Sequence, residues 1–347
     1  MEQKSVLIGM SGGVDSSVAA ALLKEQGYHV IGATMRLWTY SDSCNMKHEG
    51  CCAESAVEDA RRVCDKLGID FYVMNFKDMF KDKVVDYFVD EYIHGRTPNP
   101  CIACNKYLKF DALLKKALAM GIDYVATGHY AKIEKGEDGK YILRASEAVK
   151  KDQSYVLYNF TQEQLAHTLM PLGGYNKDWV RQKAEELGLG VAHKPDSQEI
   201  CFVEDDDYAK FITDYSGYKP KEGDILDVNG NVIGKHRGLI YYTIGQRKGI
   251  GAYGRPMFVM KIDAENNTIT LGEKGMEFSN ELTAYDVNFV SGEFPKENML
   301  ITAKVRYQAP PAAAMLCPQK DGTVKLMFPE PQRAVTPGQA VVFYDGD

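Results

Sequence analysis

The chain lacks the features of membrane-spanning and exported proteins. No uninterrupted apolar run in its 347 residues approaches the roughly 18 residues that indicate a membrane helix. The first residues, Met1-Glu2-Gln3-Lys4, lead directly into a strand-like segment and show neither a signal peptide nor an arginine-rich transit peptide. Internal repeats and low-complexity tracts are missing too. These absences exclude a transmembrane helix and favour a cytoplasmic protein.

An excess of basic charge is also missing. The chain has 41 Lys and Arg against 48 Asp and Glu, a net charge of −7, whereas nucleic-acid-binding domains are usually basic. The charge is unevenly spread, however, since residues 228–262 contain six Lys or Arg and no acid, and residues 101–150 hold nine bases against six acids. Phosphate contacts need positive charge only locally. The sequence therefore predicts a basic track across an otherwise repulsive surface.

Eight cysteines are present, but a chain of this length is no secreted disulfide scaffold. Clustered cysteines in a reducing compartment more often ligate metals or carry out thiol chemistry. Cys64 and Cys317 fit the simplest interpretation, a small buried apolar side chain. Cys44, Cys51 and Cys52 lie in a polar stretch before a predicted helix, and we assign them no role beyond capping and packing.

The first 130 residues alternate between short apolar runs and amphipathic stretches. The runs predict strands over residues 5–9, 30–37, 71–76 and 124–127, and the stretches predict helices over 16–26, 53–67, 78–93 and 107–120. Buried strands separated by helices indicate an α/β fold with a doubly wound parallel sheet. Such sheets bind ligands at the carboxyl ends of their strands.

Beyond residue 205 the pattern changes to short strands punctuated by glycine and asparagine. A helix is expected over 208–215, and residues 227–233 indicate a hairpin with its turn at Asn229-Gly230. Residues 280–347 continue as β structure, which favours one or two small barrels. We therefore expect an α/β domain over 1–205, a small central β domain over 206–277 and a β-barrel-like domain over 278–347.

The segment Ser11-Gly-Gly-Val-Asp-Ser-Ser17 connects the first predicted strand to its helix. Its glycines allow a tight turn that aims backbone N–H groups at an anion, and the start of the helix adds its positive dipole end. The hydroxyls of Ser11, Ser16 and Ser17 are further candidate donors. A plain turn with a Ser or Asp cap is the alternative, but this density of glycine and serine favours a phosphate-binding loop.

This loop lacks the lysine of the GxxxxGK[ST] motif and resembles the SGGxDS loop of the PP-loop ATP pyrophosphatases. Those enzymes cleave ATP between its α and β phosphates and adenylate a carbonyl oxygen, and the resemblance implies the same chemistry here. Asp15 is then a candidate to support Mg²⁺ or the pyrophosphate. Alternatively, Asp15 is a first-turn acid that the helix dipole favours.

Two further motifs contain cysteine. Residues 96–106 form a proline-restrained segment that opens onto a helix and carries Cys101 and Cys104, and the helix N-terminus and nearby lysines favour a thiolate there. A structural zinc half-site is the alternative, although only Cys51-Cys52 offers a second pair. The other motif holds Cys201 between two apolar residues, Ile200 and Phe202, and spacing alone favours core packing for it.

Taken together, these motifs resemble the tRNA-specific 2-thiouridylases (the MnmA/TrmU family) essentially from end to end. The matching stretches are Gly9-Met-Ser-Gly-Gly-Val-Asp-Ser16, Gly50-Cys-Cys-Ala-Glu54, Asp59-Ala-Arg-Arg62, Gly95-Arg-Thr-Pro-Asn-Pro100, Cys104-Asn-Lys106, Lys109-Phe110, Ala126-Thr-Gly-His-Tyr-Ala131, Lys151-Asp-Gln-Ser-Tyr155, Lys194-Pro-Asp-Ser-Gln198, Ile200-Cys-Phe202, Tyr242-Thr-Ile-Gly-Gln-Arg-Lys-Gly249 and Val305-Arg-Tyr307. The phosphate loop alone indicates only the superfamily. The loop, both cysteine motifs and Lys-Asp-Gln-Ser-Tyr in this order are specific to the thiouridylases.

The resemblance implies two sets of binding residues. ATP is expected on Gly9, Met10, Ser11, Gly12, Gly13, Val14, Asp15 and Ser16, with Met35 and Gly128 on the adenosine side. The substrate implied is the wobble uridine of a tRNA anticodon, flipped out of its stack, with Asn99, Pro100 and Cys101 as the target-base contact. Further tRNA contacts are expected from His129, Lys151, Asp152, Gln153, Arg306, Tyr307 and Gln339. A position after a strand end favours a substrate-facing role for His129 over that of a core histidine.

The resemblance also implies the chemistry. ATP with Mg²⁺ adenylates the uridine C2 oxygen, and a persulfide on Cys201 delivers sulfur to give 2-thiouridine. Cys104 either attacks the bound sulfur to release hydrosulfide or closes a disulfide with Cys201 after transfer. No resident metal is expected. The implied partners are tRNA (Glu, Gln and Lys acceptors) and a persulfide donor such as a cysteine desulfurase or a sulfur-relay protein.

The sequence departs from the family pattern at two places. Position 101 is Cys, where many members have Asp, so Cys101, Cys104 and Cys201 could alternatively hold a four-iron cluster that carries sulfur. The chain also stops at Tyr344-Asp-Gly-Asp347, where relatives continue with a short Gly-rich strand. We therefore expect either that the last barrel closes incompletely or that the sequence is trimmed at its C-terminus.

Two other functions compete with thiolation. The first is that of another adenylating PP-loop enzyme, such as a nucleotide amidotransferase, which would need neither Cys104 nor Cys201 nor the β domains. The second is that of a non-catalytic tRNA-binding protein with a relic nucleotide loop. The intact phosphate loop opposes the second, and loss of activity in Cys201→Ser would separate all three.

Overall fold

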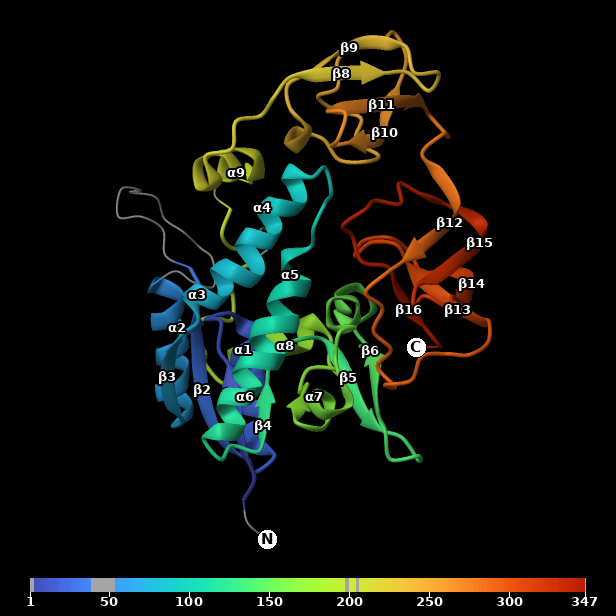
Figure 1. The fold of residues 1–347 in the computed structure, drawn as a ribbon. Coiled ribbons are helices and arrows are strands. Elements are labelled where there is room, and N and C mark those ends of the chain that lie inside the picture. The colour runs from blue at the N-terminus through green and yellow to red at the C-terminus, as the bar shows by residue number, and fades with distance from the viewer. Residues whose placement is uncertain (1–2, 39–53, 197–199, 204–205, 347) are drawn as a thin grey trace. The chain divides into compact units, whose positions relative to one another are not determined.

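The computed structural model describes residues 3–38, 54–196, 200–203 and 206–346. Figure 1 traces their helices and strands, and by their internal contacts they divide into two compact units. The first contains Met1–Val84, Cys101–Phe202 and Asn288–Glu293, and the second contains Val85–Pro100, Val203–Val287 and Phe294–Asp347. In the described part of the chain no helix has both the length and the apolar character needed to cross a membrane.

The first unit is built on a parallel sheet of five strands. Its order is β3 (Asp70–Asn75), β2 (His29–Arg36), β1 (Ser5–Gly9), β4 (Tyr124–Ala126) and β7 (Thr168–Leu169). All four neighbouring pairs are parallel. The central strand β1 is buried from Val6 to Ile8, which explains its uninterrupted apolar run. The predicted fold class is confirmed, and β7 is a strand that the sequence patterns missed.

Helices α1 (Val14–Glu25), α2 (Glu54–Leu67) and α8 (Lys177–Glu186) pack together beside this sheet. Their apolar faces join β1 and β2 in one core. Cys64 of α2 is fully buried there, and burial raises the pKa of its thiol to about 12. The prediction that Cys64 acts as a small apolar side chain is confirmed.

Two long helical stretches contain π segments. The first runs through α3 (Lys77–Phe80), a π segment η1 (Lys81–Val85) and α4 (Asp86–Ile93). The second runs through α5 (Pro100–Ala103), a π segment η2 (Cys104–Ala112) and α6 (Leu113–Ala119). Pro100 is the first helical residue, a position that suits proline because no N–H is needed there. The second helix therefore begins seven residues before the predicted start at Tyr107.

The rest of the first unit is less regular. It contains the hairpin β5 (Ala131–Lys135) and β6 (Tyr141–Ala145), the 3-10 turns η3 (Val149–Lys151) and η4 (Ser154–Leu157), and α7 (Gln162–Ala166). A short segment from late in the chain joins it. The side-chain amide of Asn288 donates to the carbonyl oxygens of Tyr158 (2.7 Å) and Phe160 (3.1 Å). The sequence patterns predicted neither the hairpin nor this long-range attachment.

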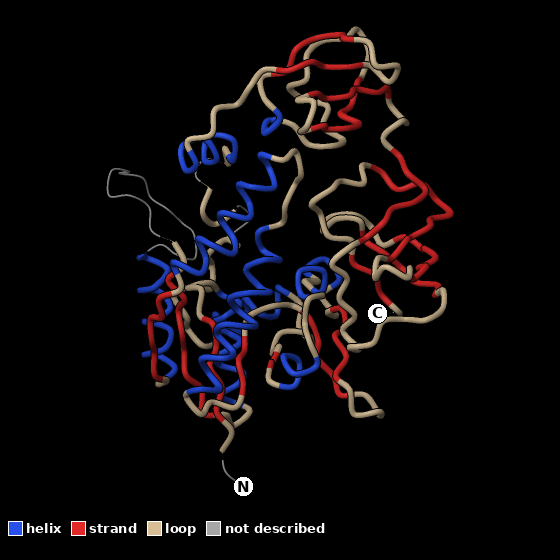
Figure 2. The backbone as a smooth tube through the Cα atoms, in the orientation of Figure 1, coloured by secondary structure: helices blue, strands red, loops and turns tan. Residues whose placement is uncertain are grey.

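The second unit contains two sheets. The central one has the order β10 (Met257–Asp263), β11 (Thr268–Glu273), β8 (Gly223–Leu226) and β9 (Val232–His236), and η5 (Leu239–Tyr241) follows β9. The C-terminal one has the order β12 (Phe278–Ala284), β15 (Val324–Arg333), β14 (Ala312–Pro318), β13 (Met299–Lys304) and β16 (Val342–Tyr344). From η5 onward the chain consists of strands and loops (Figure 2), as the glycine-punctuated pattern predicted.

The predicted hairpin joins β8 to β9. Asp227 accepts hydrogen bonds from the backbone N–H groups of Asn229 and Asn231, both at 2.9 Å, and Gly230 takes the positive φ of 86° that the turn needs. Incomplete closure of the last barrel stays a prediction.

Helix α4 belongs to the second unit, although it comes early in the chain. Tyr92 of α4 stacks on Tyr208 of α9 (Tyr208–Ser216), with ring centroids 4.6 Å apart. The hydroxyl of Tyr215 donates to the carboxylate of Asp86. Residues 85–100 are thus held by later parts of the sequence, whereas the predicted division at residues 205 and 277 follows the linear pattern alone and stays a prediction.

Asp123 fastens the start of the central strand β1 to the turn before β4. Its carboxylate accepts hydrogen bonds from Lys4 Nζ (2.6 Å) and from the backbone N–H and hydroxyl of Ser5 (both 2.9 Å). These bonds lower the pKa of Asp123 to about 2, first through Lys4 and then through Ser5.

We expect Asp123→Asn to lower the melting temperature at pH 7. The stabilisation is fully present above the unfolded-state pKa of about 4 and is lost as the pH falls through the folded-state pKa of about 2. The difference in melting temperature between variant and wild type should therefore shrink over that pH range. Asp111→Asn, which removes an exposed pair with Lys115, should change little at either pH. A pH-independent difference for Asp123→Asn would contradict this assignment.

Candidate functional site

The loop after β1 has the geometry of an anion site. Gly12 has a φ of +70°, and a Cβ placed on it would lie 2.3 Å from the carbonyl oxygen of Ala56, so only glycine fits there. Helix α1 begins directly afterwards with Gly13 as its N-cap. Because glycine has no side chain to cap the helix, the first-turn N–H groups of α1 are available to a ligand.

The three serines of the loop differ in what their hydroxyls do. Ser16 Oγ lies 3.3 Å from Ser11 Oγ and donates to the carbonyl oxygen of Gly13 at 3.2 Å. Ser17 is fully buried, and its hydroxyl donates to the same carbonyl at 2.8 Å. Ser11 and Ser16 thus stay candidates for ligand contact. The prediction is wrong for Ser17, because its hydroxyl holds the helix start together.

Gly128 brings the end of β4 against the phosphate loop. A Cβ on Gly128 would lie 2.6 Å from the backbone nitrogen of Ser16 and 2.8 Å from the carbonyl carbon of Asp15. The structure therefore brings Gly128 and residues 9–16 together, as predicted. Met10 and Val14 are buried and can offer only their backbone, while Met35 is partly buried on β2.

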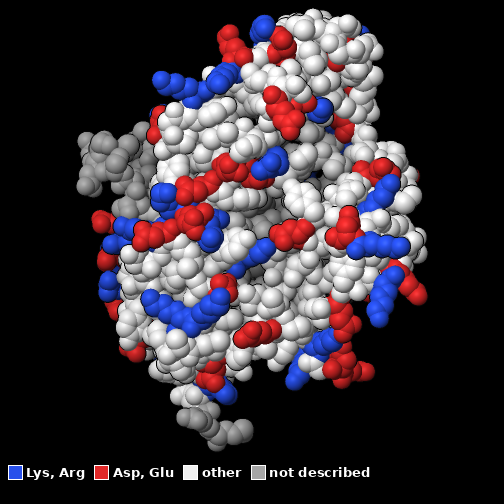
Figure 3. All heavy atoms as spheres, viewed as in Figure 1, with Lys and Arg blue, Asp and Glu red and all other residues white. Residues whose placement is uncertain are grey.

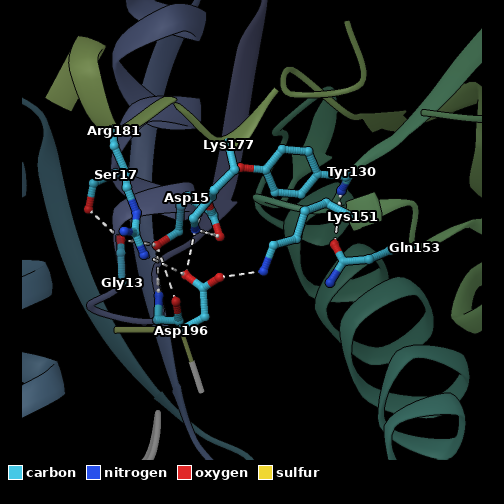
Figure 4. A network of polar contacts seen from close by, with 11 residues as sticks. Gly13, Asp15, Ser17, Tyr130, Lys151, Gln153, Lys177, Arg181 and Asp196 are labelled. Carbon is cyan, nitrogen blue, oxygen red and sulfur yellow. Dashed lines mark hydrogen bonds and ion pairs between the residues drawn. The ribbon is translucent and has the colours of Figure 1, made fainter. Parts of the chain in front are cut away.

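The carboxylate of Asp15 is the centre of a polar network (Figure 4). Lys177, from the first turn of α8, donates to both of its oxygens at 2.7 and 2.8 Å, and the Tyr130 hydroxyl donates at 2.7 Å. Burial and the neighbouring Asp15 carboxylate raise the pKa of Tyr130 above its ordinary value. Asp15 is therefore neither a plain first-turn acid nor an open carboxylate.

Lys177 connects Asp15 to a second carboxylate, that of Asp196. Its Nζ lies 2.6 Å from Asp196 Oδ1, and Lys151 Nζ donates to Asp196 Oδ2 at 2.6 Å. Burial alone would raise the pKa of Asp196, but the hydrogen bonds from Lys151 and Lys177 outweigh burial and lower it. Arg181 adds a third cation at 3.9 Å.

A second lysine ties the same loop to α2. Lys194 Nζ donates to the carbonyl oxygen of Gly12 at 3.2 Å and to Asp59 Oδ2 at 3.0 Å. Sequence reasoning assigned no role to Lys177, Arg181, Lys194 or Tyr130. The only signal was that Lys194, Asp196 and Tyr130 lie in stretches that match the family. Nothing in the spacing pointed to Lys177, which is 162 residues from Asp15.

Cys104 begins the π segment η2 within the helix that starts at Pro100. Its side chain is buried, whereas Cys101, one turn earlier, is exposed. π segments inside helices are frequent at functional sites. The next residue, Asn105, is also buried; its amide nitrogen donates to the carbonyl oxygen of Val156, and its Oδ1 has no hydrogen-bond partner. Cys104 is therefore held on a rigid element.

Cys201 lies in a short irregular segment and is partly buried. The neighbouring Phe202 takes the core position instead, with its ring centroid 5.6 Å from that of Phe80 and 6.4 Å from that of Trp38. Core packing, which spacing alone favoured for Cys201, is thus the role of Phe202. Ser197, Gln198 and Glu199, like Cys44, Cys51 and Cys52, lie outside the described residues.

The three thiols at 101, 104 and 201 were an alternative set of cluster ligands. All three residues are described, and the described part of the chain contains no group of three His, Cys, Asp or Glu side chains placed to hold a metal ion. The cluster alternative therefore stays a prediction from the sequence.

His129 lies at the carboxyl end of β4, as predicted, but it is partly buried. Its Nδ1 and the Thr127 hydroxyl share a 2.7 Å hydrogen bond. Burial, and then the charge of Lys109, lowers the pKa of His129 well below its ordinary value. The imidazole is therefore neutral at physiological pH, and any substrate contact would use its other nitrogen.

Two of the other predicted tRNA residues brace their own loop. Asp152 accepts hydrogen bonds from the backbone of Ser146 (3.0 Å) and the hydroxyl of Ser154 (2.7 Å). Gln153 Oε1 accepts from the backbone N–H of Tyr130 at 2.9 Å. These bonds place Lys151 and Tyr130 around the Asp15 network.

The remaining predicted tRNA residues lie in the second unit. Asn99 is partly buried in the loop after α4, and Pro100, the first residue of α5, is buried. Arg306 is partly buried, and Tyr307 is 38% exposed with Lys304 Nζ 5.7 Å from its ring centroid. The side-chain amide of Gln339 donates to the carbonyl oxygens of Thr97 (2.8 Å) and Pro98 (3.3 Å). Gln339 therefore meets the Asn99 loop.

A cavity of about 600 Å³ lies at the carboxyl ends of β2 and β3. Charged and polar side chains dominate its lining, and none of them was predicted to bind ATP. The lining residues are Arg36, Glu54, Val57, Glu58, Arg61, Val73, Asn75 and Lys77. The predicted nucleotide site and this cavity are thus formed by different residues.

Much of the positive charge of the stretch 228–262 is neutralised by ion pairs in the structure. Lys235 pairs with Asp224 at 2.5 Å, Arg255 with Glu273 at 2.7 Å and Lys261 with Asp263 at 3.0 Å. On the face seen in Figure 3, basic and acidic side chains lie interspersed. Half of the six basic residues are therefore paired with acids from outside the stretch, and the predicted basic track stays a prediction.

Comparison with known families gives matches over nearly the whole chain. The model described as tRNA methyl transferase HUP domain matches residues 4–205, the tRNA methyl transferase PRC-barrel domain 209–273, and the aminomethyltransferase beta-barrel domain 279–347. The tRNA-specific 2-thiouridylase MnmA of Acetivibrio thermocellus is 59% identical over 350 residues, covering 100% of this chain and 98% of that protein. The protein of the same name from Clostridioides difficile is 58% identical, covering 99% and 96%.

Among solved structures the likeness is partial. A 4-thiouridine synthetase–RNA complex with bound ATP is 18% identical, covers 57% of this chain and 45% of that chain, and gives a TM-score of 0.38. NMN synthetase from Francisella tularensis is 16% identical, with coverage of 63% and 79% and a TM-score of 0.36.

We expect Gly128→Ala to weaken ATP binding about tenfold or more. The new methyl group would overlap the backbone of Ser16, and relieving such overpacking costs about 1–3 kcal/mol, which the phosphate loop would absorb by shifting. Isothermal titration with ATP measures the effect. Gly174→Ala is the matched control, because its Cβ would meet nothing within 4 Å. Equal ATP affinity in both variants would sink the assignment.

We expect Lys177→Met to lower the free energy of unfolding by about 1–3 kcal/mol, because it leaves two carboxylates without their shared cation, and to weaken ATP binding. Lys177→Arg should restore part of both losses. Lys183→Met on the same helix removes only the pair with Glu25 at 2.9 Å and should cost less than about 1 kcal/mol. Urea unfolding and ATP titration check this, and indistinguishable Lys177→Met and Lys183→Met proteins would refute it.

Proposed function

Because the chain belongs to the family of tRNA-specific 2-thiouridylases, we propose that it catalyses the ATP-dependent conversion of the wobble uridine (position 34) of tRNA to 2-thiouridine. The observation that carries the proposal is the phosphate loop, which has Gly128 against its backbone and Lys177 joining its Asp15 to Asp196. Asp196 stands five residues before Cys201. One network thus connects the proposed ATP site with the segment of the proposed sulfur carrier.

We assign ATP to the loop through its triphosphate. We assign its phosphates to the N–H groups of residues 11–16 at the start of α1, with the adenosine toward Met35 and Gly128. Lys177, Lys151 and Arg181 outnumber the two carboxylates that they contact, so the network keeps a net positive charge beside the anion. Mg²⁺ normally takes substrate phosphates, waters and one or two carboxylates. Asp15 could serve as such a carboxylate only by giving up one bond to Lys177.

The proposed reaction has two stages. The uridine C2 oxygen attacks the α phosphorus of ATP, and pyrophosphate leaves; this converts the oxygen into an AMP leaving group. The outer sulfur of a Cys201 persulfide then replaces AMP at C2. In one route the Cys104 thiolate attacks Cys201 Sγ first, which forms the Cys104–Cys201 disulfide and releases the outer sulfur as hydrosulfide, and the hydrosulfide then displaces AMP. In the other route the persulfide sulfur displaces AMP first, and Cys104 then attacks Cys201 Sγ, which forms the same disulfide and leaves the sulfur on C2. The two thiols supply the two electrons that reduce the transferred sulfur, and a thiol reductant resets them.

The proposed substrate must present an unstacked base to these groups. We assign the target-base contact to Asn99, Pro100 and Cys101. The proposed tRNA contacts are His129, Lys151, Asp152, Gln153, Arg306, Tyr307 and Gln339. By family membership we also propose Glu, Gln and Lys acceptors, a persulfide donor such as a cysteine desulfurase or sulfur-relay protein, a cytoplasmic location, and three domains over 1–205, 206–277 and 278–347.

Incubation of unmodified tRNA with the protein, ATP, Mg²⁺ and a persulfide donor tests the function. Mass analysis of the nucleosides should show 2-thiouridine. Cys201→Ser and Cys104→Ser should each reduce it at least about a thousandfold, because a hydroxyl carries no sulfur and the nucleophile and its partner act as a unit. Both variants should still bind ATP and tRNA.

Cys317→Ser is the matched control, since it makes the same change in a partly buried cysteine of β14, and it should keep full activity. The competing functions give different results. An adenylating amidotransferase would be indifferent to Cys201→Ser, and a non-catalytic binder would release no pyrophosphate. Absence of 2-thiouridine with the wild-type protein would overturn the proposal.

A further inference from the structure

The loop of residues 95–100, which leads from α4 into the helix of Cys104, is fastened within the second unit by hydrogen bonds to its backbone groups. The N–H of Thr97 donates to the carbonyl oxygen of Pro337 at 2.9 Å. In return, Gln339 Nε2 donates to the carbonyl oxygens of Thr97 and Pro98. The turn of residues 336–339 thus holds Thr97 through both its N–H and its carbonyl group, which fixes the peptide planes on either side of that residue.

Gly338 makes this contact closer than any other residue would allow. Its φ is +91°, and a Cβ built on it would lie 2.8 Å from the Thr97 nitrogen, 2.9 Å from the Thr97 oxygen and 3.0 Å from the carbonyl carbon. The neighbour is backbone rather than the end of a flexible side chain, so it cannot give way cheaply. The turn and the loop therefore fit each other only with glycine at 338.

Two residues of the central β region, Thr243 and Ile262, also contact this loop. The hydroxyl of Thr97 donates to the hydroxyl of Thr243 at 3.3 Å, and a Cβ on Gly95 would lie 2.6 Å from Ile262 Cγ2 of β10. Within the loop itself, Arg96 Nε donates to Glu91 of α4 at 2.8 Å. The C-terminal turn 336–339, the central β region and α4 thus all contact the loop of residues 95–100.

We propose that Gly338 and Gln339 are positioning residues for the target base. They fix the conformation of the 95–100 loop, and with it the placement of Asn99 and Pro100, from which the helix of Cys104 starts. The inference rests on the proposed function, in which Asn99 and Pro100 meet the base. It goes beyond the implied tRNA contact of Gln339, because the side-chain amide of Gln339 is used here to hold protein backbone.

Two alanine substitutions at left-handed glycines test the proposal. Gly338→Ala should collide with Thr97, whereas Gly322→Ala, at a φ of +84° in the β14–β15 turn, carries the same backbone strain and meets nothing within 4 Å. Neither change removes a polar group that tRNA could contact. In Gly338→Ala the turnover of tRNA to 2-thiouridine should fall about tenfold or more, because a target base that is held out of position reacts more slowly. Its tRNA affinity should stay within about twofold of wild type, since one rearranged loop leaves phosphate contacts intact.

Hydrogen exchange on the protein without tRNA gives a second readout, which does not need the proposed reaction. The Thr97 amide should exchange faster in Gly338→Ala than in the wild type or Gly322→Ala. Should Gly338→Ala fail to fold, Gln339→Ala should show the same faster exchange in the 95–100 peptide. Unchanged exchange and turnover in Gly338→Ala, or tRNA affinity that falls in step with turnover, would overturn the positioning role. If the wild-type protein forms no 2-thiouridine, the proposed function is refuted. If the Thr97 amide still exchanges faster in Gly338→Ala, the attachment of the loop by Gly338 is supported independently of that function.

Discussion

The ammonium group of Lys177 is the point on which the proposed site depends. It is 11% exposed and lies between the carboxylates of Asp15 and Asp196. A charge this far from solvent is costly unless opposite charges and hydrogen bonds surround it, and the alternation Lys151, Asp196, Lys177, Asp15 meets that requirement in a row. The arrangement holds three separate parts of the chain, the phosphate loop, α8 and the segment before Cys201, in one geometry. An anion bound at the loop would lie next to the Asp15 end of this row, and its charge would act on the other charged groups of the row.

Close backbone approach is the second constraint, and it recurs at three places where distant segments meet. Gly12 fits against Ala56, Gly128 against Ser16 and Gly338 against Thr97, each at a distance that a Cβ would violate. In every case the neighbour is main chain, so side-chain rotation offers no relief. The glycines of the sequence therefore serve two purposes. Some allow a turn, as Gly230 does. Others lie where a loop of the site contacts the backbone of a neighbouring segment too closely for a Cβ.

Local sequence patterns predicted the helices, strands and turns that short-range interactions determine. Uninterrupted apolar runs gave β1 to β4, an amphipathic period gave α2, and Asn229-Gly230 gave the hairpin, because burial and turn chemistry act over a few residues. The two-residue strand β7 and the attachment of residues 288–293 follow from tertiary contacts that leave no periodicity. The pairing of Lys177 with Asp15 spans 162 residues, and acids outside the stretch 228–262 pair with half of its basic residues. Spacing alone favoured Cys201 as a core residue, and only the ring cluster around Phe80 shows that Phe202 takes that position.

The two cysteines of the proposed reaction have environments that suit different tasks. A sulfur carrier must first meet an external donor and then reach the base, which requires exposure and an irregular segment that can adjust. Cys201 is partly exposed in an irregular segment, and the buried ring of Phe202 attaches that segment to the core. A resolving thiol needs no donor, only a fixed position toward which the carrier returns. Cys104 is buried at the start of a π segment in a helix that begins with proline, which suits the fixed position of the proposed resolving thiol.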